Sequence, residues 1–234
     1  MPPDGAAEAA ALLRERRPAQ GPFIVALTGS VASGKTTFAE ALKAAVESWP
    51  DRPTVELVCT DGFLRPNAEL DAAGLTIRKG FPETYDAEAL AGALAQVRQG
   101  PATFPAYSHV TYDVDPALAR EVTPPDVLIV EGLCLQAPVG ADALIYLDAD
   151  EALIEDWFVE RFIGLWAAAE HDETSFYRRF RTMAEPAARD FARMVWTQIN
   201  LPNLREHIAA ARGIADIVVR KGVGHAALAV TAAP

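Results

Sequence analysis

Short runs of consecutive apolar residues alternate with longer amphipathic stretches along most of the chain. Unbroken apolarity over three to five residues is typical of strands that are buried on both faces of a parallel sheet. The runs cover residues 23–27, 127–130, 143–147 and 217–219, and residues 55–59, although interrupted by Glu56, also read as a strand. Helical spacing is found at residues 35–47, 86–98, 150–168, 173–199 and 203–212. This alternation predicts an α/β fold, namely a three-layer, doubly wound and mostly parallel sheet.

Two segments lie outside this pattern. Residues 1–20 are rich in Ala, Pro and Arg, and we interpret them as a flexible N-terminal tail, either frayed or formed into one loose helix. Residues 21–234 then form a single domain, because neither internal repeats nor a second core pattern is seen. Residues 61–85 are irregular, and a loop this long in a compact domain is usually functional.

The first predicted strand runs into a glycine-rich turn that opens the first predicted helix. Residues 29–36, GSVASGKT, match GxxxxGK[ST] at every fixed position. The glycines let the backbone curl so that its N–H groups point inward, and the helix N-terminus adds about half a positive charge. The motif predicts a P-loop for the phosphates of ATP, formed by Gly29, Ser30, Val31, Ala32, Ser33, Gly34, Lys35, Thr36 and Thr37. In it Lys35 reaches the β- and γ-phosphates and Thr36 ligates Mg²⁺.

The charge balance limits the possible partners. The chain has 21 Lys and Arg against 32 Asp and Glu, a net charge of −11. We therefore expect no binding to a nucleic-acid backbone and none to an anionic membrane surface. No apolar run is long enough to span a bilayer, and Cys59 and Cys134 suggest neither a disulfide framework nor a metal site. The expected setting is the cytoplasm, with a small molecule as the partner.

Acidic and aromatic residues supply further candidates. Glu131 follows a buried strand, where an acid can hold Mg²⁺ or its waters, although it could also simply cap a loop. Asp61 ends the second strand and can accept a proton from an attacking hydroxyl, or it only starts a turn. Residues 107–113 mix aromatic and polar groups, which suits a small polar ligand as well as a structural His among core tyrosines. Arg161, on an apolar helix face, either clamps a phosphoryl group or pairs with an acid.

Several segments together resemble the bacterial type I pantothenate kinases, in the P-loop kinase group that also holds uridine kinase and phosphoribulokinase. The segments are GSVASGKTT (29–37), TDGF (60–63), KGFPETYD (79–86), PAYSHVTYDV (105–114) and LIVEGL (128–133), and more weakly WFVERF (157–162), INLPNL (199–204) and KGVGH (221–225). They span residues 23–230. The resemblance implies a homodimeric enzyme that uses ATP to phosphorylate the primary hydroxyl of pantothenate, the first step toward coenzyme A.

The resemblance also implies roles for individual residues. Lys35 and Thr36 would hold the ATP phosphates and Mg²⁺, with Glu131 as a second group for the metal. Asp61 would be the base that takes the hydroxyl proton, and Arg161 would stabilise charge on the phosphoryl group. Lys221 and His225 would lie near the adenine. The acceptor site would be lined by Asp61, Tyr107, His109, Tyr112, Phe158, Asn200 and Asn203.

Some positions depart from the family pattern. Most of the usual N-terminal extension is missing, and Phe158 stands where a tyrosine that bonds the substrate is expected. Glu40 replaces a basic residue and Leu165 an aromatic one, which predicts weak or absent feedback inhibition by coenzyme A. Two alternatives therefore stay open. One is a kinase of the same fold for another small hydroxyl compound, such as a nucleoside, a sugar or glycerate. The other is a regulatory nucleotide-binding ATPase, against which Asp61 and the tyrosines of residues 107–112 argue.

Overall fold

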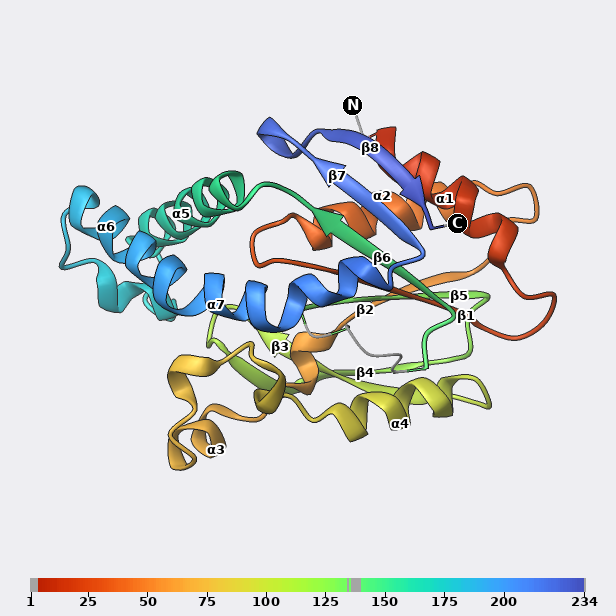
Figure 1. The fold of residues 1–234 in the computed structure, drawn as a ribbon. Helices are drawn as coiled ribbons and strands as arrows, with labels where there is room; N and C mark the ends of the chain where they lie inside the picture. The colour runs from red at the N-terminus through yellow and green to blue at the C-terminus, as the bar shows by residue number, and fades with distance from the viewer. Residues whose placement is uncertain (1–3, 134, 136–139, 234) are drawn as a thin grey trace.

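A six-stranded sheet forms the centre of the molecule (Figure 1). The computed structural model describes residues 4–133, 135 and 140–233, so Cys134 lies outside the described residues. The strand order is β2-β5-β1-β6-β7-β8, with β8 antiparallel to β7 and the other neighbours parallel. The bounds are β1 (Phe23–Gly29), β2 (Val55–Cys59), β5 (Val127–Glu131), β6 (Ala143–Asp148), β7 (Ile217–Lys221) and β8 (Ala227–Ala232). The predicted α/β fold with a mostly parallel sheet is confirmed.

Strand β1 is buried over its whole length, as its unbroken apolar sequence predicts. Because successive side chains of a strand point to opposite faces, its residues divide between two cores. Ile24 and Ala26 belong to the core on one face, and Phe23, Val25 and Leu27 to the core on the other. The sheet therefore needs a cover on both sides.

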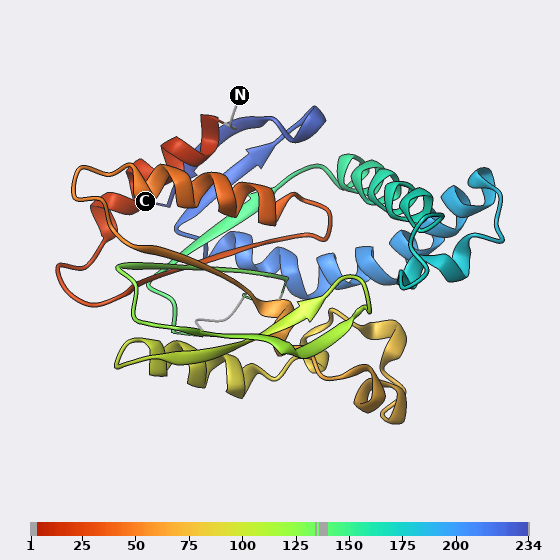
Figure 2. The same cartoon turned by 180° about the vertical axis from the view of Figure 1, so that it is seen from behind.

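Helices supply that cover on each face (Figures 1 and 2). On one face lie α1 (Asp4–Arg16) and α2 (Lys35–Glu47), which share a core with β1. The other face is covered by α4 (Ala87–Val97), by the ribbon of β3 (Ala102–Ser108) and β4 (Asp113–Val122), and by the helical stretch 196–213 that includes α7 (Leu201–Asn203). Asp86 caps α4, its carboxylate accepting from the Ala89 N–H at 2.9 Å.

The sequence predicts a flexible tail over residues 1–20, but in the structure Asp4–Arg16 pack tightly on the rest of the molecule. This segment is a helix whose Ala6, Ala9, Ala10 and Leu13 are at most 2% exposed. Their spacing places them on one helix face, and the alanines let that face approach α2 and β8 closely. The alanine-rich composition therefore reflects close packing and not disorder.

The β3–β4 ribbon and β8 are not predicted by the sequence pattern. Strand β4 is exposed over six consecutive residues and contains Pro116, so it shows no apolar alternation. Proline is tolerated here because a two-stranded ribbon has free edges. Strand β8 consists mainly of alanine and has only partly buried or exposed residues, so it also lacks the pattern of a core strand.

The predicted helix over residues 173–199 is wrong over residues 173–184. The helix α6 (Glu185–Val195) begins only at residue 185, because Pro186 fits the first turn of a helix but not its interior. Before it, Phe176–Phe180 form a 3₁₀ turn, and after it Trp196–Asn200 form a π-helical turn. The predicted helix over 203–212 is likewise a π-helical turn followed by a 3₁₀ turn.

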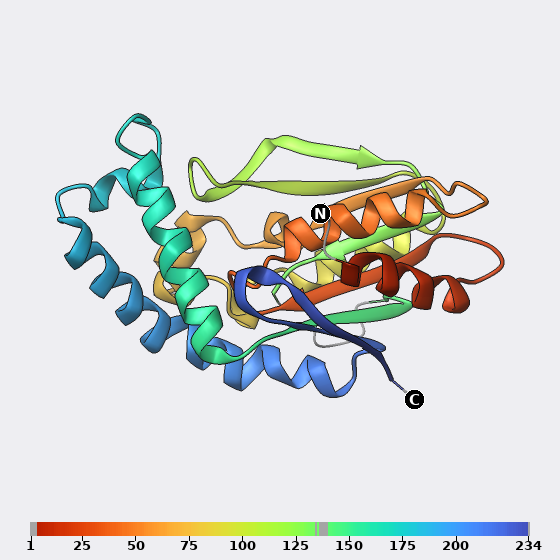
Figure 3. The same ribbon diagram turned by 90° about the horizontal axis from the view of Figure 1, so that it is seen from above.

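Helices α5 (Glu151–Ala168) and α6 form an arm that reaches away from the sheet (Figure 3). The arm has a small core of its own, with Phe162, Ile163 and Ala188. The loop over residues 61–85 contains the short helix α3 (Asn67–Ala72) and three 3₁₀ turns, the first of which begins at Thr60. None of the helices among the described residues has the length and apolarity needed to cross a membrane.

The packing of α1 leads to a stability prediction. Leu13 is 0% exposed, so Leu13→Ala leaves a cavity and is expected to lower the free energy of unfolding by about 2–5 kcal/mol. Glu15→Ala, at an exposed position of the same helix, should change it by less than about 0.5 kcal/mol. Chemical denaturation of both variants measures the difference. Equal, small effects would mean that the helix does not pack on the sheet in solution.

Candidate active site

The predicted site residues converge at the carboxyl edge of the parallel strands. Strand β1 ends in Gly29, the first residue of the P-loop, and Glu131 ends the neighbouring strand β5. In the register of β2 and β5, Cys59 stands beside Glu131, so Asp61 follows directly at the same edge. Ligands bind at this edge in open parallel sheets. The structure thus brings together residues that are far apart in the chain.

The P-loop has a backbone that only small residues allow. Gly34 has φ +80° and lies just before α2, with Ala32 at φ +59° in the turn. A Cβ atom on Gly34 would be 2.9 Å from Lys221 Nζ and 3.2 Å from His225 Nδ1. Glycine is therefore required at this position both by backbone conformation and by close approach. The turn delivers the N-terminus of α2 to the site, where its positive end faces a bound anion.

Lys35 folds back over the loop that precedes it. Its Nζ donates to the carbonyls of Ser30 at 2.9 Å and Gly29 at 3.3 Å. Burial lowers the pKa of Lys35, while the charges of Glu131 and Asp61 oppose that shift. Its ammonium therefore stands between the P-loop carbonyls and two carboxylates, where it can meet the charge of a phosphate chain.

Thr36 and Glu131 form a pair of oxygen ligands. Thr36 Oγ1 donates to Glu131 Oε1 at 2.8 Å, and Glu131 is 5% exposed. Magnesium prefers oxygen ligands and usually takes one or two from protein, with phosphates and waters completing its shell. Nowhere in the described residues do three or more His, Cys, Asp or Glu gather into a metal-binding group. The pair therefore fits Mg²⁺ that arrives with a polyphosphate.

Asp61 lies in a 3₁₀ turn, Thr60–Phe63, that is packed against the β3–β4 ribbon. A Cβ atom on Gly62 would be 2.0 Å from the carbonyl oxygen of Pro105, so the ribbon can approach only a glycine. Tyr85 donates its hydroxyl to Asp61 Oδ1 at 3.1 Å. Sequence reasoning missed Tyr85 as a site residue, although it belongs to the segment KGFPETYD that carries the family resemblance.

Aromatic side chains gather beside Asp61. Tyr107 packs edge-to-face on His109 and Tyr112, with ring centroids 5.2 and 5.8 Å apart. Burial raises the pKa of Tyr107 and Tyr112, and both remain neutral hydrogen-bonding phenols at physiological pH. A pocket of about 160 Å³ opens here, lined by Leu57, Val58, Cys59, Asp61, Phe104, Pro105, Ala106, Tyr107, His109 and Arg120.

Lys79 is a further residue that sequence reasoning did not single out. Its Nζ donates to Asn67 Oδ1 at 2.6 Å and to the Tyr112 carbonyl at 2.7 Å. It also lies over the rings of Tyr107 and Tyr112, 4.8 and 4.9 Å from their centroids. Burial lowers the pKa of Lys79, against the charges of Asp113 and Asp61. The ammonium group of Lys79 therefore packs against the rings of Tyr107 and Tyr112.

Four of the predicted acceptor residues lie outside the lining of that pocket, among them Tyr112, which packs on Tyr107 beside it. Phe158 packs on Trp196 at 6.1 Å between ring centroids, near the base of the arm. Asn200 is half-buried in the π-helical turn. Asn203 is 4% exposed, and its amide donates to the Gly80 carbonyl at 2.9 Å, while its buried Oδ1 has no hydrogen-bond partner among the described residues. Asn203 thus ties the helical stretch 196–213 to the loop that carries Lys79.

Arg161 projects from α5 toward the site. It is exposed, and its positive charge adds to the burial that lowers the pKa of Lys35 and opposes the burial that raises the pKa of Tyr112. Within the described residues it forms no ion pair. Its guanidinium is therefore available for an anion between the P-loop and the aromatic group.

Lys221 and His225 lie against the P-loop, close to Ser33 and Gly34. Lys221 Nζ donates to the Ser33 carbonyl at 2.8 Å, and the residue is 4% exposed. Burial and the charge of Lys35 lower the pKa of Lys221 to about 8. His225 stacks on Trp157, with ring centroids 3.9 Å apart and planes 24° apart. Burial and the charge of Lys221 also lower the pKa of His225.

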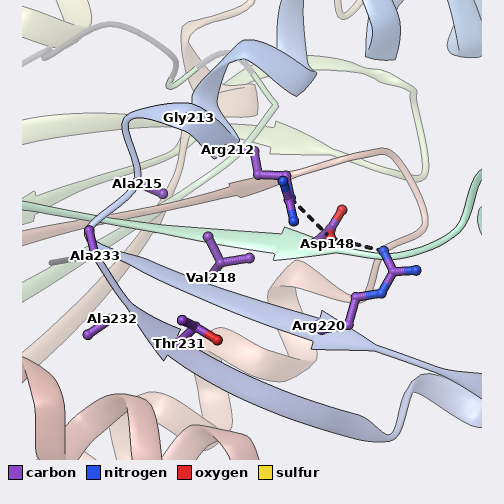
Figure 4. A pocket seen from close by; sticks show the side chains of 9 residues that line it. All are labelled: Asp148, Arg212, Gly213, Ala215, Val218, Arg220, Thr231, Ala232 and Ala233. Carbon is purple, nitrogen blue, oxygen red and sulfur yellow. Dashed lines mark hydrogen bonds and ion pairs between the residues drawn. The ribbon is translucent and has the colours of Figure 1, made fainter.

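A larger hollow lies on another part of the sheet. It has a volume of about 650 Å³, and it is lined by Asp148, Arg212, Gly213, Ala215, Val218, Arg220, Thr231, Ala232 and Ala233 (Figure 4). Arg212 pairs with Asp148, and Arg220 pairs with both Asp148 and Asp150, so two carboxylates balance the two cations. None of the predicted site residues lines this hollow, which leaves the strand edge as the candidate site.

The state of Lys221 predicts a pH dependence for nucleotide binding. Bound phosphates favour the protonated amine, and its lowered pKa of about 8 means that this proton is lost in the free protein as the pH rises. ATP affinity should therefore fall between about pH 7 and about pH 9. Calorimetric titration should show a smaller fall for Lys221→Met than for wild type or for Lys43→Met, a control on α2. Equal slopes in all three proteins would contradict the role of Lys221.

Comparison with known proteins agrees with this geometry. Residues 24–161 match the model of the Phosphoribulokinase / Uridine kinase family. A "Pantothenate kinase" of Sorangium cellulosum is 46% identical over 221 residues, which cover 89% of this chain and 72% of that protein. A "Pantothenate kinase" of Streptomyces coelicolor is 44% identical over 220 residues, or 87% of this chain and 67% of that protein.

Solved structures share the fold. A candidate kinase of a fructose transport system from Silicibacter sp. TM1040 superposes with a TM-score of 0.70 at 26% identity, covering 89% of this chain and 94% of that one. A candidate uridine kinase from Bacillus stearothermophilus gives 0.54 at 22% identity, over 72% and 89% of the two chains. Sequence, fold and the P-loop edge lead to one assignment: the chain belongs to the phosphoribulokinase and uridine kinase family.

Proposed function

We propose that this chain is an ATP-dependent kinase that phosphorylates the primary hydroxyl of pantothenate. The observation that carries the proposal is the convergence of Thr36, Glu131, Lys35 and Asp61 at one strand edge, beside a pocket lined by tyrosine and histidine. Phosphates and a hydroxyl acceptor can meet there. The choice of pantothenate is supported by the relatives named pantothenate kinase, which are 43–46% identical over most of the chain.

The residues divide the work of an in-line phosphoryl transfer. The P-loop N–H groups and Lys35 hold the phosphate chain, and Arg161 neutralises charge on the transferred group. Thr36 and Glu131 would hold Mg²⁺, whose charge would screen the phosphate oxygens. Asp61 orients the acceptor hydroxyl and takes its proton as the oxygen–phosphorus bond forms and the bond to the leaving ADP breaks. Most of the rate gain comes from positioning and charge stabilisation.

A second acceptor class is favoured by one observation. Phe158 has no hydroxyl, and its ring packs on Trp196 outside the lining of the small pocket, so it cannot give an acceptor the hydrogen bond expected of the family's tyrosine. A nucleoside, a sugar or glycerate would not need that bond. The Silicibacter structure, a candidate kinase of a fructose transport system, shows that the fold is found with other acceptor assignments.

We also propose that the enzyme works as a homodimer in the cytoplasm, with residues 21–234 as one kinase domain on which α1 packs. The family resemblance supports the dimer. The free thiol of Cys59 and the acidic composition are consistent with a reducing compartment and a small-molecule partner.

Product analysis tests the proposed reaction. Purified protein with Mg-ATP should release ADP only when pantothenate is present, and mass spectrometry should show pantothenate with one added phosphate. Lys35→Ala should reduce turnover by at least about a hundredfold, because it removes a charge that acts on the transferred phosphates. ATP binding without turnover of pantothenate, but with turnover of a nucleoside, sugar or glycerate, would move the proposal to that acceptor. ATP hydrolysis without any phosphorylated product would indicate a regulatory ATPase.

Feedback by coenzyme A is expected to be weak or absent. Glu40 is exposed on α2, close to the P-loop, where its carboxylate would repel the phosphates of coenzyme A, and Leu165 offers no aromatic surface. Glu40→Arg should strengthen inhibition, and Glu47→Arg at the far end of the same helix should not. The measurement is inhibition by coenzyme A at millimolar ATP. Half-inhibition of the wild type by micromolar coenzyme A would overturn this expectation.

A further inference from the structure

Tyr85 is buried directly beside the proposed base. It is 7% exposed and follows a 3₁₀ turn, Pro82–Thr84, in the loop between β2 and α4. Its hydroxyl donates to Asp61 Oδ1 at 3.1 Å, across 24 residues of chain. The family resemblance assigns no role to this residue, and the geometry supplies one.

The backbone around Tyr85 is fastened to the turn that carries Asp61. Tyr85 forms an antiparallel bridge with Leu64. On either side of it, the Asp86 N–H donates to the Phe63 carbonyl at 2.8 Å and the Arg65 N–H donates to the Thr84 carbonyl at 2.8 Å. These bonds hold the phenol and the carboxylate on two paired segments, so their separation does not depend on a mobile side chain alone.

The Asp61 turn is also held from its other sides. The Asp61 N–H donates to Cys59 Sγ at 3.5 Å, and the Asp61 carbonyl accepts from the Leu64 N–H at 3.2 Å. The ribbon also packs close to Gly62, since a Cβ atom there would be 2.0 Å from the Pro105 carbonyl oxygen. With the backbone fixed, the remaining freedom of Asp61 is the rotation of its side chain, and Tyr85 is the group that restrains it.

The bond to Tyr85 distinguishes the two carboxylate oxygens. Oδ1 accepts from the phenol, whereas no described residue donates to Oδ2. Asp61 lines the small pocket together with Tyr107 and His109. A base that must take a proton from an acceptor hydroxyl needs one oxygen free and correctly oriented within hydrogen-bond reach. The phenol provides the restraint that leaves Oδ2 for this task.

We infer that Tyr85 is a positioning residue, which holds the Asp61 carboxylate by Oδ1 so that Oδ2 faces the acceptor hydroxyl. This inference rests on the proposed function, because it takes Asp61 as the base. It predicts that loss of the phenol hydroxyl lowers the rate of the chemical step and leaves ATP binding unchanged. The expected loss in kcat for Tyr85→Phe is about tenfold, the usual effect of losing one hydrogen bond to a charged group.

A double-mutant cycle separates this role from a structural one. The proteins are wild type, Tyr85→Phe, Asp61→Asn and the double variant, with Tyr146→Phe as the control. Tyr146 lies on β6, is 4% exposed and is also a buried tyrosine, so it loses the same atom elsewhere in the core. Tyr85→Phe should lower kcat at constant KM for ATP, and Tyr146→Phe should not. In the Asp61→Asn background the Tyr85 substitution should have no further effect, because both residues act through one carboxylate.

Two kinetic results would overturn the inference. One is a kcat for Tyr85→Phe that matches that of Tyr146→Phe. The other is an equal loss from Tyr85→Phe in the wild-type and Asp61→Asn backgrounds, since independent residues have additive effects.

Crystal structures of wild type and Tyr85→Phe test the positioning role of Tyr85 without an acceptor substrate. The Asp61 side chain should turn away or become disordered in the variant, and an unchanged Asp61 rotamer would contradict the positioning role. If the wild type does not phosphorylate pantothenate, the proposed function fails, while this structural comparison still decides whether Tyr85 holds Asp61.

Discussion

The burial of β1 on both faces is the constraint on which the rest of the structure depends. A central strand with no exposed residue requires an apolar layer on each side of the sheet. Its neighbours β5 and β6 run parallel to it, so the strands deliver their carboxyl ends to one edge. The P-loop and Glu131 meet at that edge for this reason. The position of the site therefore follows from the parallel arrangement of strands that are buried on both faces.

Charge at this edge opposes the charge of the whole protein. The chain carries −11 overall, yet Lys35, Lys79 and Lys221 stand around the candidate site, each with a pKa lowered mainly by burial. The pKa of each lysine is lowered because its ammonium group is shielded from solvent and lacks a full counter-charge. Phosphates would supply that counter-charge. A few buried cations can therefore serve a polyanion inside an acidic protein.

The acceptor side is assembled from segments that are distant in the chain. Phe176, from the arm, stacks on Tyr112 with ring centroids 4.2 Å apart, and its N–H donates to the Val110 carbonyl at 3.2 Å. Asn203 holds Gly80 from the helical stretch 196–213. Together with the bond between Tyr85 and Asp61, these contacts connect the arm, the loop over residues 61–85 and the ribbon around one small pocket.

The parallel sheet, its main strands and the P-loop could be predicted from sequence, because apolar runs and a glycine-rich turn are local signals. The positions of Asp61 and Glu131 at strand ends could be predicted in the same way. Features that depend on packing between distant segments could not. The alanines of α1 carry no sign in the sequence that they pack against α2, and the exposed β4 has no apolar periodicity. Tyr85 and Lys79 acquire their roles through contacts across 24 and 33 residues of chain, and periodicity over a few residues cannot reveal such contacts.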